Sequence, residues 1–123
     1  MTPLERARGA IGARFRLHGR TVAGGLDCVG LVAFAYDAGG VASGYALRSD
    51  DRVTVARMAA RAGLVRGDGR RPGDLILYDA GPGQLHLAID SGAGVIHADA
   101  GLRRVVERPG VPPWREIGRW RRC

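Results

Sequence analysis

The sequence predicts an α+β domain in which N-terminal helices pack on a C-terminal antiparallel β-sheet. The 123 residues fit one compact domain, residues 1–123, better than two. The first half carries apolar residues at helical spacing, whereas the part after Pro72 consists of short strand-like runs separated by glycine or proline. Helices followed by strands are typical of an α+β fold with an antiparallel sheet.

The first predicted helix covers Pro3 to Ala13. Thr2 and Glu5 form the T-x-x-E pattern of a capping box, and proline suits the first helical position. Gly12 stands where such a helix ends. The next segment, Phe15 to Leu26, has no periodicity and carries three glycines, so we expect it to be a loop.

Two more helices are predicted before the strands begin. The second starts at Asp27 or Cys28 and runs to about Ala38, because apolar residues recur at i, i+3, i+4 and i+7 and Gly39-Gly40 follows. The third covers Arg52 to Ala62, and Asp50 or Asp51 can cap it. Five strand-like runs come after Pro72: Leu75 to Tyr78, Leu85 to Asp90, Val95 to Ala98, Arg103 to Glu107 and Arg115 to Arg121.

The positive charge is concentrated near the C-terminus. All 19 basic residues are arginines, the net charge is +7, and the segment Gly101 to Cys123 holds +5 of it. Such a tail can bind nucleic acid, but it has no recognition-helix pattern or aromatic platform, so we expect no specific nucleic-acid partner. We expect the tail to follow an edge of the sheet, with Trp114, Ile117 and Trp120 packed inward and the arginines pointing outward.

Composition excludes several classes of protein. Apolar residues make up 46% and charged residues 25%, which argues against disorder. The sequence has no apolar run of about 18 residues and no apolar N-terminal core, so we expect neither membrane insertion nor a signal peptide. The two cysteines, Cys28 and Cys123, form no disulfide framework and no C-x-x-C zinc pair. Cys123 is expected to be an inert terminal thiol.

Cys28 is a candidate nucleophile. It follows a capping residue, Asp27, and opens an apolar helix. Backbone N–H groups at a helix N-terminus favour negative charge, so a thiol there tends to have a lowered pKa. Gly30 would let a substrate or a neighbouring element approach closely. The alternative interpretation of Cys28 is a small buried side chain that happens to start a helix.

His86 and His97 lie on consecutive predicted strands and are expected to face the same way. His86 alternates with apolar residues, so it points away from them. In an antiparallel pair, the residue numbers of directly opposite residues always add up to the same sum, and this sum is odd when the turn within Ser91 to Gly94 has two or four residues. The sum of 86 and 97 is also odd, so both histidine side chains point to the same face. A two-residue turn at Ser91-Gly92 would place the histidines directly opposite, and a turn centred between Gly92 and Ala93 would make them diagonal neighbours about 7–8 Å apart.

Together these residues could form an acyl-transfer triad, with Cys28 as nucleophile, His86 as base and His97 as the group that orients the base. Taken singly, each histidine is better explained as a core residue or a strand-end surface residue, and it is the combination with a helix-start cysteine that favours the triad. The same three side chains could also hold zinc. We favour the triad, and therefore expect no metal and no cofactor.

Four motifs occur in the order of a known family: Asp27-Cys28-Val29-Gly30-Leu31 beside its D-C-S-G-L, Pro72-Gly73-Asp74-Leu75 beside P-G-D-L, His86-Leu87-Ala88-Ile89 beside H-V-G-I, and Ile96-His97-Ala98 beside I-H-A. Over about Gly12 to Ala100, the sequence resembles the NlpC-type papain-like cysteine peptidases, which act on cell walls. Within that family it is most similar to the subset found in phage tails and gene transfer agents.

The resemblance implies a papain-like fold and a thiol hydrolase of peptidoglycan stem-peptide amide bonds, cleaving next to D-glutamate and a diamino acid. It implies peptidoglycan stem peptides as substrate, phage tail proteins as partners, and no cofactor. Because no signal peptide is expected, the protein should be made in the cytoplasm and act from a virion or in the periplasm.

Two residues depart from the family pattern. Val29 stands where the family usually has serine, and Phe15 stands where it usually has a tyrosine whose hydroxyl faces the active site. The backbone N–H of Cys28, or His18, would then have to stabilise the transition state. Phe15, His18 and Asp27 are the candidate substrate-binding residues, although His18 taken alone is better explained as a loop residue. The alternative function is a catalytically weak wall-binding or tail-structural module that keeps the fold.

Overall fold

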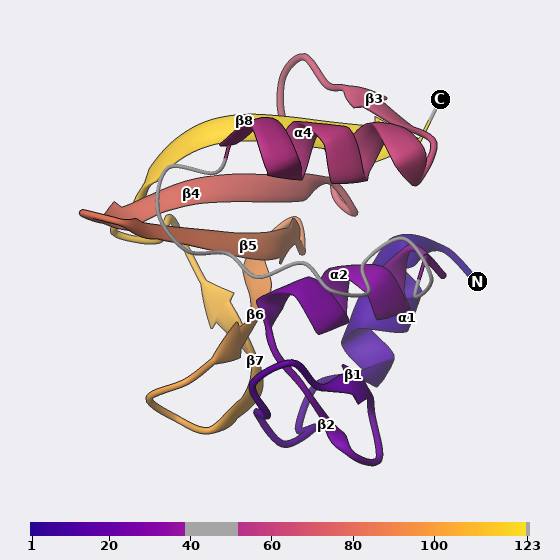
Figure 1. Cartoon of the computed structure of the whole chain (residues 1–123), viewed down its shortest axis with the longest axis vertical. Coiled ribbons are helices and arrows are strands. Elements are labelled where there is room, and N and C mark those ends of the chain that lie inside the picture. The colour runs from indigo at the N-terminus through magenta and orange to yellow at the C-terminus, as the bar shows by residue number, and fades with distance from the viewer. Residues whose placement is uncertain (39–51, 123) are drawn as a thin grey trace.

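The computed structural model describes residues 1–38 and 52–122. Within them the helices are α1 (Pro3–Gly9), α2 (Cys28–Ala35) and α4 (Arg52–Arg61), all shown in Figure 1. The strands are β1 (Arg20–Thr21), β2 (Gly25–Leu26), β3 (Leu64–Arg66), β4 (Leu75–Gly81), β5 (Gln84–Asp90), β6 (Gly94–Asp99), β7 (Arg104–Pro109) and β8 (Arg115–Arg122). In these residues no helix has the length and apolar character needed to cross a membrane.

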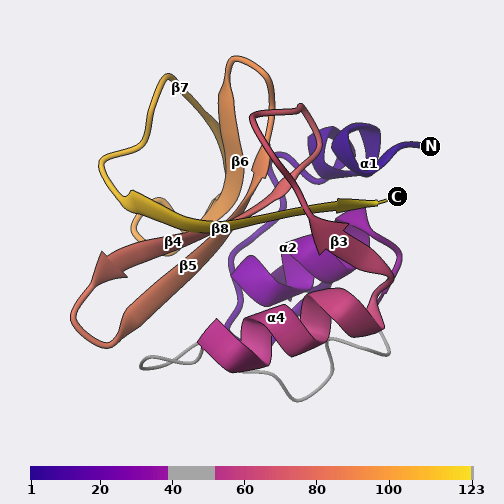
Figure 2. The same cartoon turned by 90° about the horizontal axis from the view of Figure 1, so that it is seen from above.

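The main sheet has six strands in the order β3-β8-β4-β5-β6-β7, and every neighbouring pair is antiparallel. Strands β4 to β7 follow one another in sequence and in space, whereas β8 returns to lie between β3 and β4. The helices lie on one side of this sheet, as Figure 2 shows from above. The predicted α+β class, with helices packed on a C-terminal antiparallel sheet, is confirmed.

The two faces of the sheet carry different residues. On β4 and β5 the apolar side chains that alternate toward the helices belong to the main core: Leu75, Leu77, Leu85, Leu87 and Ile89. The opposite face holds a smaller cluster: Ile76, Tyr78, Ala88, Val95 and, partly buried, Trp114. His86 lies between Leu85 and Leu87, so strand alternation places it on the face away from the helices, as predicted.

The helix starts match their sequence signals better than the helix ends. Thr2 and Glu5 form the predicted capping box, with the Glu5 N–H donating to Thr2 Oγ1 at 3.1 Å. Helix α1 nevertheless stops at Gly9 and not at Ala13, because the chain turns at Gly12, whose φ is +92° and whose N–H donates to the Val105 carbonyl at 2.9 Å.

The ends of the other two helices differ from prediction by different amounts. Helix α2 ends at Ala35 and not at Ala38, since the chain adopts a left-handed conformation at Asp37, with φ of +53°. Helix α4 ends at Arg61, one residue before the predicted end. The predicted stop at Gly39-Gly40 and the predicted caps, Asp50 and Asp51, lie outside the described residues.

The segment predicted to be a loop, Phe15 to Leu26, contains the small β1–β2 hairpin, in which Arg20 pairs with Leu26 and Thr21 with Gly25. Strand β3 was also not predicted. Both are too short, at two or three residues, to show an alternating pattern.

The C-terminal tail follows an edge of the sheet only in its first part, where β7 is an edge strand, and the prediction is wrong for β8. Strand β8 is an inner strand, because β3 pairs along its other side. Trp120 is buried and Ile117 is partly buried, as expected, but Arg119 is buried as well. The carboxylates of Asp74, just before β4, and Asp90, at the end of β5, neutralise this arginine, which is why it can point inward.

Candidate active site

Cys28 is the first residue of α2, and Asp27 is its N-cap. The Gly30 N–H donates to Asp27 Oδ1 at 2.8 Å, which satisfies one of the free donors at the helix start. Helix α2 is buried on almost every side, and its predicted apolar stripe lies in the core. The half-buried Cys28 is therefore held at a fixed point where the helix meets the sheet.

Asp27 organises the segment in front of the helix. Its Oδ2 accepts the His18 N–H at 2.8 Å, and its Oδ1 accepts a bond from Arg20 Nη1 at 2.8 Å. With only 7% of Asp27 exposed, the carboxylate mainly supports this segment, and it fixes His18 in a left-handed conformation with φ of +61°. Asp27 still contributes to the cleft wall.

Gly30 permits a close approach of neighbouring backbone. A Cβ at this position would collide with the Gly19 carbonyl oxygen. The group that approaches Gly30 closely is therefore a neighbouring element of the same chain, the second of the two predicted alternatives. This contact joins the first turn of α2 to the segment that contains His18.

Replacing Gly30 with alanine is expected to lower the free energy of unfolding by about 1–3 kcal/mol, the usual cost of overpacking. It should also lower activity, because relief of the clash must shift Gly19 or the start of α2. Urea denaturation measures the first effect. Gly9→Ala is the matched control, since a Cβ at the end of α1 meets nothing within 4 Å. A Gly30→Ala variant as stable as Gly9→Ala would contradict the packing argument.

The two histidines form a hydrogen-bonded pair. Ile89 pairs with Ile96 and Asp90 with Val95, so the turn between β5 and β6 is the alternative centred between Gly92 and Ala93. His86 and His97 are then diagonal neighbours on one face, and His86 Nε2 lies 2.9 Å from His97 Nδ1. Their rings meet edge to face at 90°, with centroids 5.1 Å apart. One histidine can therefore orient the other, as the sequence predicts.

Trp114, from the segment between β7 and β8, packs on both imidazole rings. Its ring centroid lies 5.0 Å from that of His86 and 5.5 Å from that of His97. It also contacts Tyr78 on β4, with centroids 5.6 Å apart. The indole covers one side of the histidine pair and so helps to keep water away from it.

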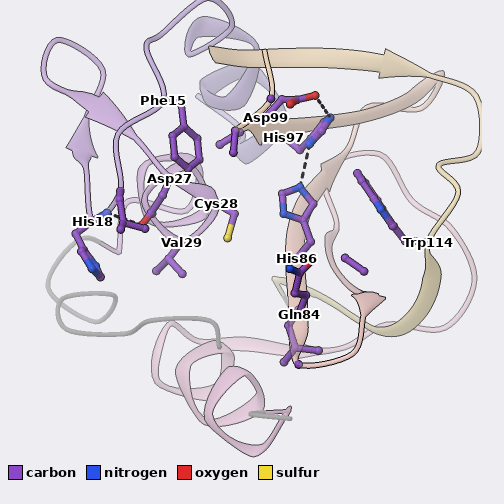
Figure 3. A pocket seen from close by; sticks show the side chains of 17 residues that line it. Phe15, His18, Asp27, Cys28, Val29, Gln84, His86, His97, Asp99 and Trp114 are labelled. Atoms are coloured by element: carbon purple, nitrogen blue, oxygen red, sulfur yellow. Dashed lines mark hydrogen bonds and ion pairs between the residues drawn. The ribbon is translucent and has the colours of Figure 1, made fainter. Parts of the chain in front are cut away.

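One open cleft of about 820 Å³ brings the predicted residues together. All six of them line it: Phe15, His18, Asp27, Cys28, His86 and His97. Figure 3 shows Cys28 and His86 on opposite sides of the cleft, with His97 beyond His86 and His18 on the far side of Asp27 from Cys28. The cleft thus places Cys28 and the histidine pair face to face, and leaves His18 on the rim.

The predicted lowering of the Cys28 pKa is wrong for this structure. Burial against β5 raises the pKa of the thiol to about 11, and the nearby Asp27 carboxylate adds to the rise. The backbone N–H groups of Leu87, Val29 and Cys28 favour the thiolate and oppose this rise only in part.

The histidine pair is uncharged at neutral pH. Burial lowers the pKa of His86 to about 4, the charge that His97 could carry lowers it further, and Asp99 opposes both effects. Burial also lowers the pKa of His97. Between about pH 4 and 11 the resting site therefore holds a neutral thiol and a neutral imidazole. Attack by sulfur must then accompany transfer of its proton to His86.

Two residues of the site were not predicted from the sequence, Asp99 and Trp114. Asp99 Oδ2 lies 4.0 Å from His97 Nε2. Because Asp99 follows His97 by two positions on one strand, alternation could have identified it. Trp114 comes from an irregular segment with no periodic signal, so only the structure shows its contacts with the histidines.

The zinc alternative fits the geometry poorly. His86 Nε2 and His97 Nδ1 bond to each other, so these two nitrogens are not both turned toward a shared ligand position. Within residues 1–38 and 52–122, no group of three or more histidine, cysteine or acidic side chains is arranged to hold a metal ion.

Comparison with solved structures supports the fold. No protein-family model and no curated protein matches the chain. The peptidoglycan hydrolase RipB from Mycobacterium tuberculosis is similar in structure, with a TM-score of 0.59 and 25% sequence identity. The match covers 98% of this chain and 62% of the RipB chain, so this chain spans less than two thirds of that protein. The chain thus has the papain-like α+β fold seen in a peptidoglycan hydrolase.

Proposed function

We propose that this chain is a cysteine peptidase of the NlpC type that hydrolyses amide bonds in peptidoglycan stem peptides. The observation that carries the proposal is one cleft in which Cys28, at a helix N-terminus, faces a hydrogen-bonded His86–His97 pair. The likeness to the peptidoglycan hydrolase RipB supports the class of substrate.

The chemistry follows from the placement of these side chains. Cys28 Sγ attacks the amide carbonyl while its proton passes to His86, which becomes an imidazolium held by His97. His86 then protonates the leaving amine, and the acyl group stays on Cys28. Water, deprotonated by His86, releases the acid and restores the thiol. The backbone N–H of Cys28 at the start of α2 is the candidate donor to the oxyanion, since Phe15 carries no hydroxyl.

A second candidate function is a wall-binding or tail-structural module with little catalysis. One observation favours it: the pKa of the Cys28 thiol is raised to about 11, whereas an activated thiol has a lowered one. The association with a phage tail or gene transfer agent, and action from a virion or in the periplasm, are part of the proposal and rest on the sequence resemblance.

Digestion of purified peptidoglycan separates the two functions. The enzyme should release shortened stem peptides, and mass analysis of the products identifies the bond through its new amine and carboxyl ends. Cleavage next to D-glutamate and the diamino acid would agree with the resemblance. A protein that sediments with peptidoglycan but releases no product would support the binding module and overturn the enzyme.

A further inference from the structure

The protons of the histidine pair can be assigned from the proposed chemistry. To receive the thiol proton, the His86 nitrogen on the cleft side must be unprotonated in the resting state. His86 Nε2 is already in the bond to His97 Nδ1, so the nitrogen left for Cys28 is Nδ1. Neutral His86 then carries its hydrogen on Nε2 and donates it to His97 Nδ1. Neutral His97 must therefore carry its own hydrogen on Nε2.

The Nε2–H group of His97 is buried. His97 is only 3% exposed, and its Nε2 has no hydrogen-bond partner among the described residues. The acidic group beside it is Asp99, with Oδ2 at 4.0 Å, within ion-pair distance but beyond a hydrogen bond. A buried N–H without a hydrogen-bond partner costs free energy. The negative charge of Asp99 beside Nε2 offsets this cost and so favours the His97 tautomer that carries its hydrogen on Nε2.

The Asp99 carboxylate is itself held in place. Its Oδ1 accepts the Leu102 N–H at 3.0 Å, in the turn between β6 and β7. The other charged groups that act on the histidines are few: Arg108 on β7 disfavours the charged form of His97, and each histidine would disfavour a charge on the other. Among the residues that the structure describes, Asp99 is the group that favours positive charge on both rings.

We propose that Asp99 is a positioning residue of this site, which holds His97 in the Nε2–H tautomer and so keeps His86 Nδ1 free to accept the Cys28 proton. The inference rests on the proposed function and extends the triad to a line of four groups, Cys28, His86, His97 and Asp99. No proton moves onto Asp99 during the reaction. Its charge orients His97 before the reaction and stabilises the imidazolium that forms on His86.

Asp99→Asn tests this with little change in shape, because the amide oxygen can still accept the Leu102 N–H. Asp79→Asn is the matched control: Asp79 Oδ1 accepts the Gly81 N–H at 3.0 Å, and its Oδ2 lies 3.9 Å from Arg115. Both variants keep a turn hydrogen bond and lose one negative charge, beside His97 in Asp99→Asn and beside Arg115 in Asp79→Asn. Only Asp99 faces the histidines.

With peptidoglycan as substrate, Asp99→Asn should lower kcat roughly 10- to 100-fold with little change in KM, below the full range of general acid–base catalysis. Loss of the negative charge destabilises the imidazolium, so the pKa of His86 falls and the acid limb of the kcat/KM profile moves to lower pH. Asp79→Asn should leave kcat, KM and the acid limb unchanged.

Nitrogen-15 NMR of the imidazole rings gives a readout that does not depend on turnover. We expect wild-type His97 as the Nε2–H tautomer, the Nδ1–H tautomer populated in Asp99→Asn, and the wild-type pattern in Asp79→Asn. Wild-type His97 in the Nδ1–H tautomer, or an unchanged tautomer in Asp99→Asn, overturns the inference whatever happens to activity. If the wild-type protein cleaves no peptidoglycan, the proposed function fails and the tautomers still decide the role of Asp99.

Discussion

Replacing Cys28 with alanine is expected to abolish peptidoglycan hydrolysis while the fold stays intact. Without the sulfur no acyl-enzyme can form, and loss of a nucleophile usually costs about 10⁴-fold or more in rate. The helix start should tolerate the change, because Asp27 still caps α2 through the Gly30 N–H and alanine is a good helix former. Product analysis by mass spectrometry measures activity, and circular dichroism with thermal melting checks the fold.

Two further variants make the assignment specific. Cys28→Ser keeps a hydroxyl at the same point, and we expect it to be nearly inactive, because serine is a far weaker nucleophile than cysteine when its base has a low pKa. Cys123→Ala changes the other cysteine, which lies outside the described residues, and should retain full activity. Loss of activity in Cys123→Ala together with full activity in Cys28→Ala would show that the wrong thiol has been assigned.

The relation between the two histidines could be predicted because it depends on counting alone. Any turn with an even number of residues places both rings on one face of the sheet, because the residue numbers 86 and 97 add up to an odd sum. The structure has such a turn, centred between Gly92 and Ala93. The start of α2 at Cys28 was equally predictable, since an aspartate N-cap before an apolar run is a local signal. Local patterns of this kind place His86 beside His97 and Cys28 at the start of a helix.

Other features depend on distant contacts and could not be predicted. Whether Arg119 points inward depends on Asp74 and Asp90, which lie 45 and 29 residues away in sequence. The pKa of Cys28 depends on how closely β5 packs against the thiol, which a helix-start pattern does not show. Trp114 reaches the histidines only because its irregular segment crosses the outer face of the sheet.

Replacing Asp74 with alanine is expected to cause the largest loss of stability among single changes outside the cleft. Asp74 is 1% exposed and lies at the start of β4, where it binds two arginines of β8: Arg119 Nη1 at 2.9 Å and Arg121 Nη2 at 2.7 Å. Arg119 also binds Asp90 on β5 at 2.8 Å, so the network ties three adjacent strands together. These include β5, the strand that presents His86.

Removing one member of such a network leaves buried charge without its counter-charge, at a cost of about 3–5 kcal/mol. In Asp74→Ala, Arg119 keeps Asp90 and Glu116, but Arg121 loses its carboxylate partner, and the Arg71 N–H loses its acceptor. The melting temperature should fall by roughly 10–20 °C, as expected for that loss in a domain of this size.

Asp79→Ala is the matched comparison for stability, because the Asp79–Arg115 pair is exposed and 3.9 Å long. Exposed pairs contribute at most about 1 kcal/mol, so this variant should melt within a few degrees of the wild type. Denaturation in urea, followed by circular dichroism, compares the two free energies of unfolding directly. Equal losses in Asp74→Ala and Asp79→Ala would mean that the buried network contributes no more than a surface pair, and that apolar packing alone holds β4, β5 and β8 together. A selective loss in Asp74→Ala would show that the aspartate of the P-G-D-L segment holds in place the strands on which the histidine pair depends.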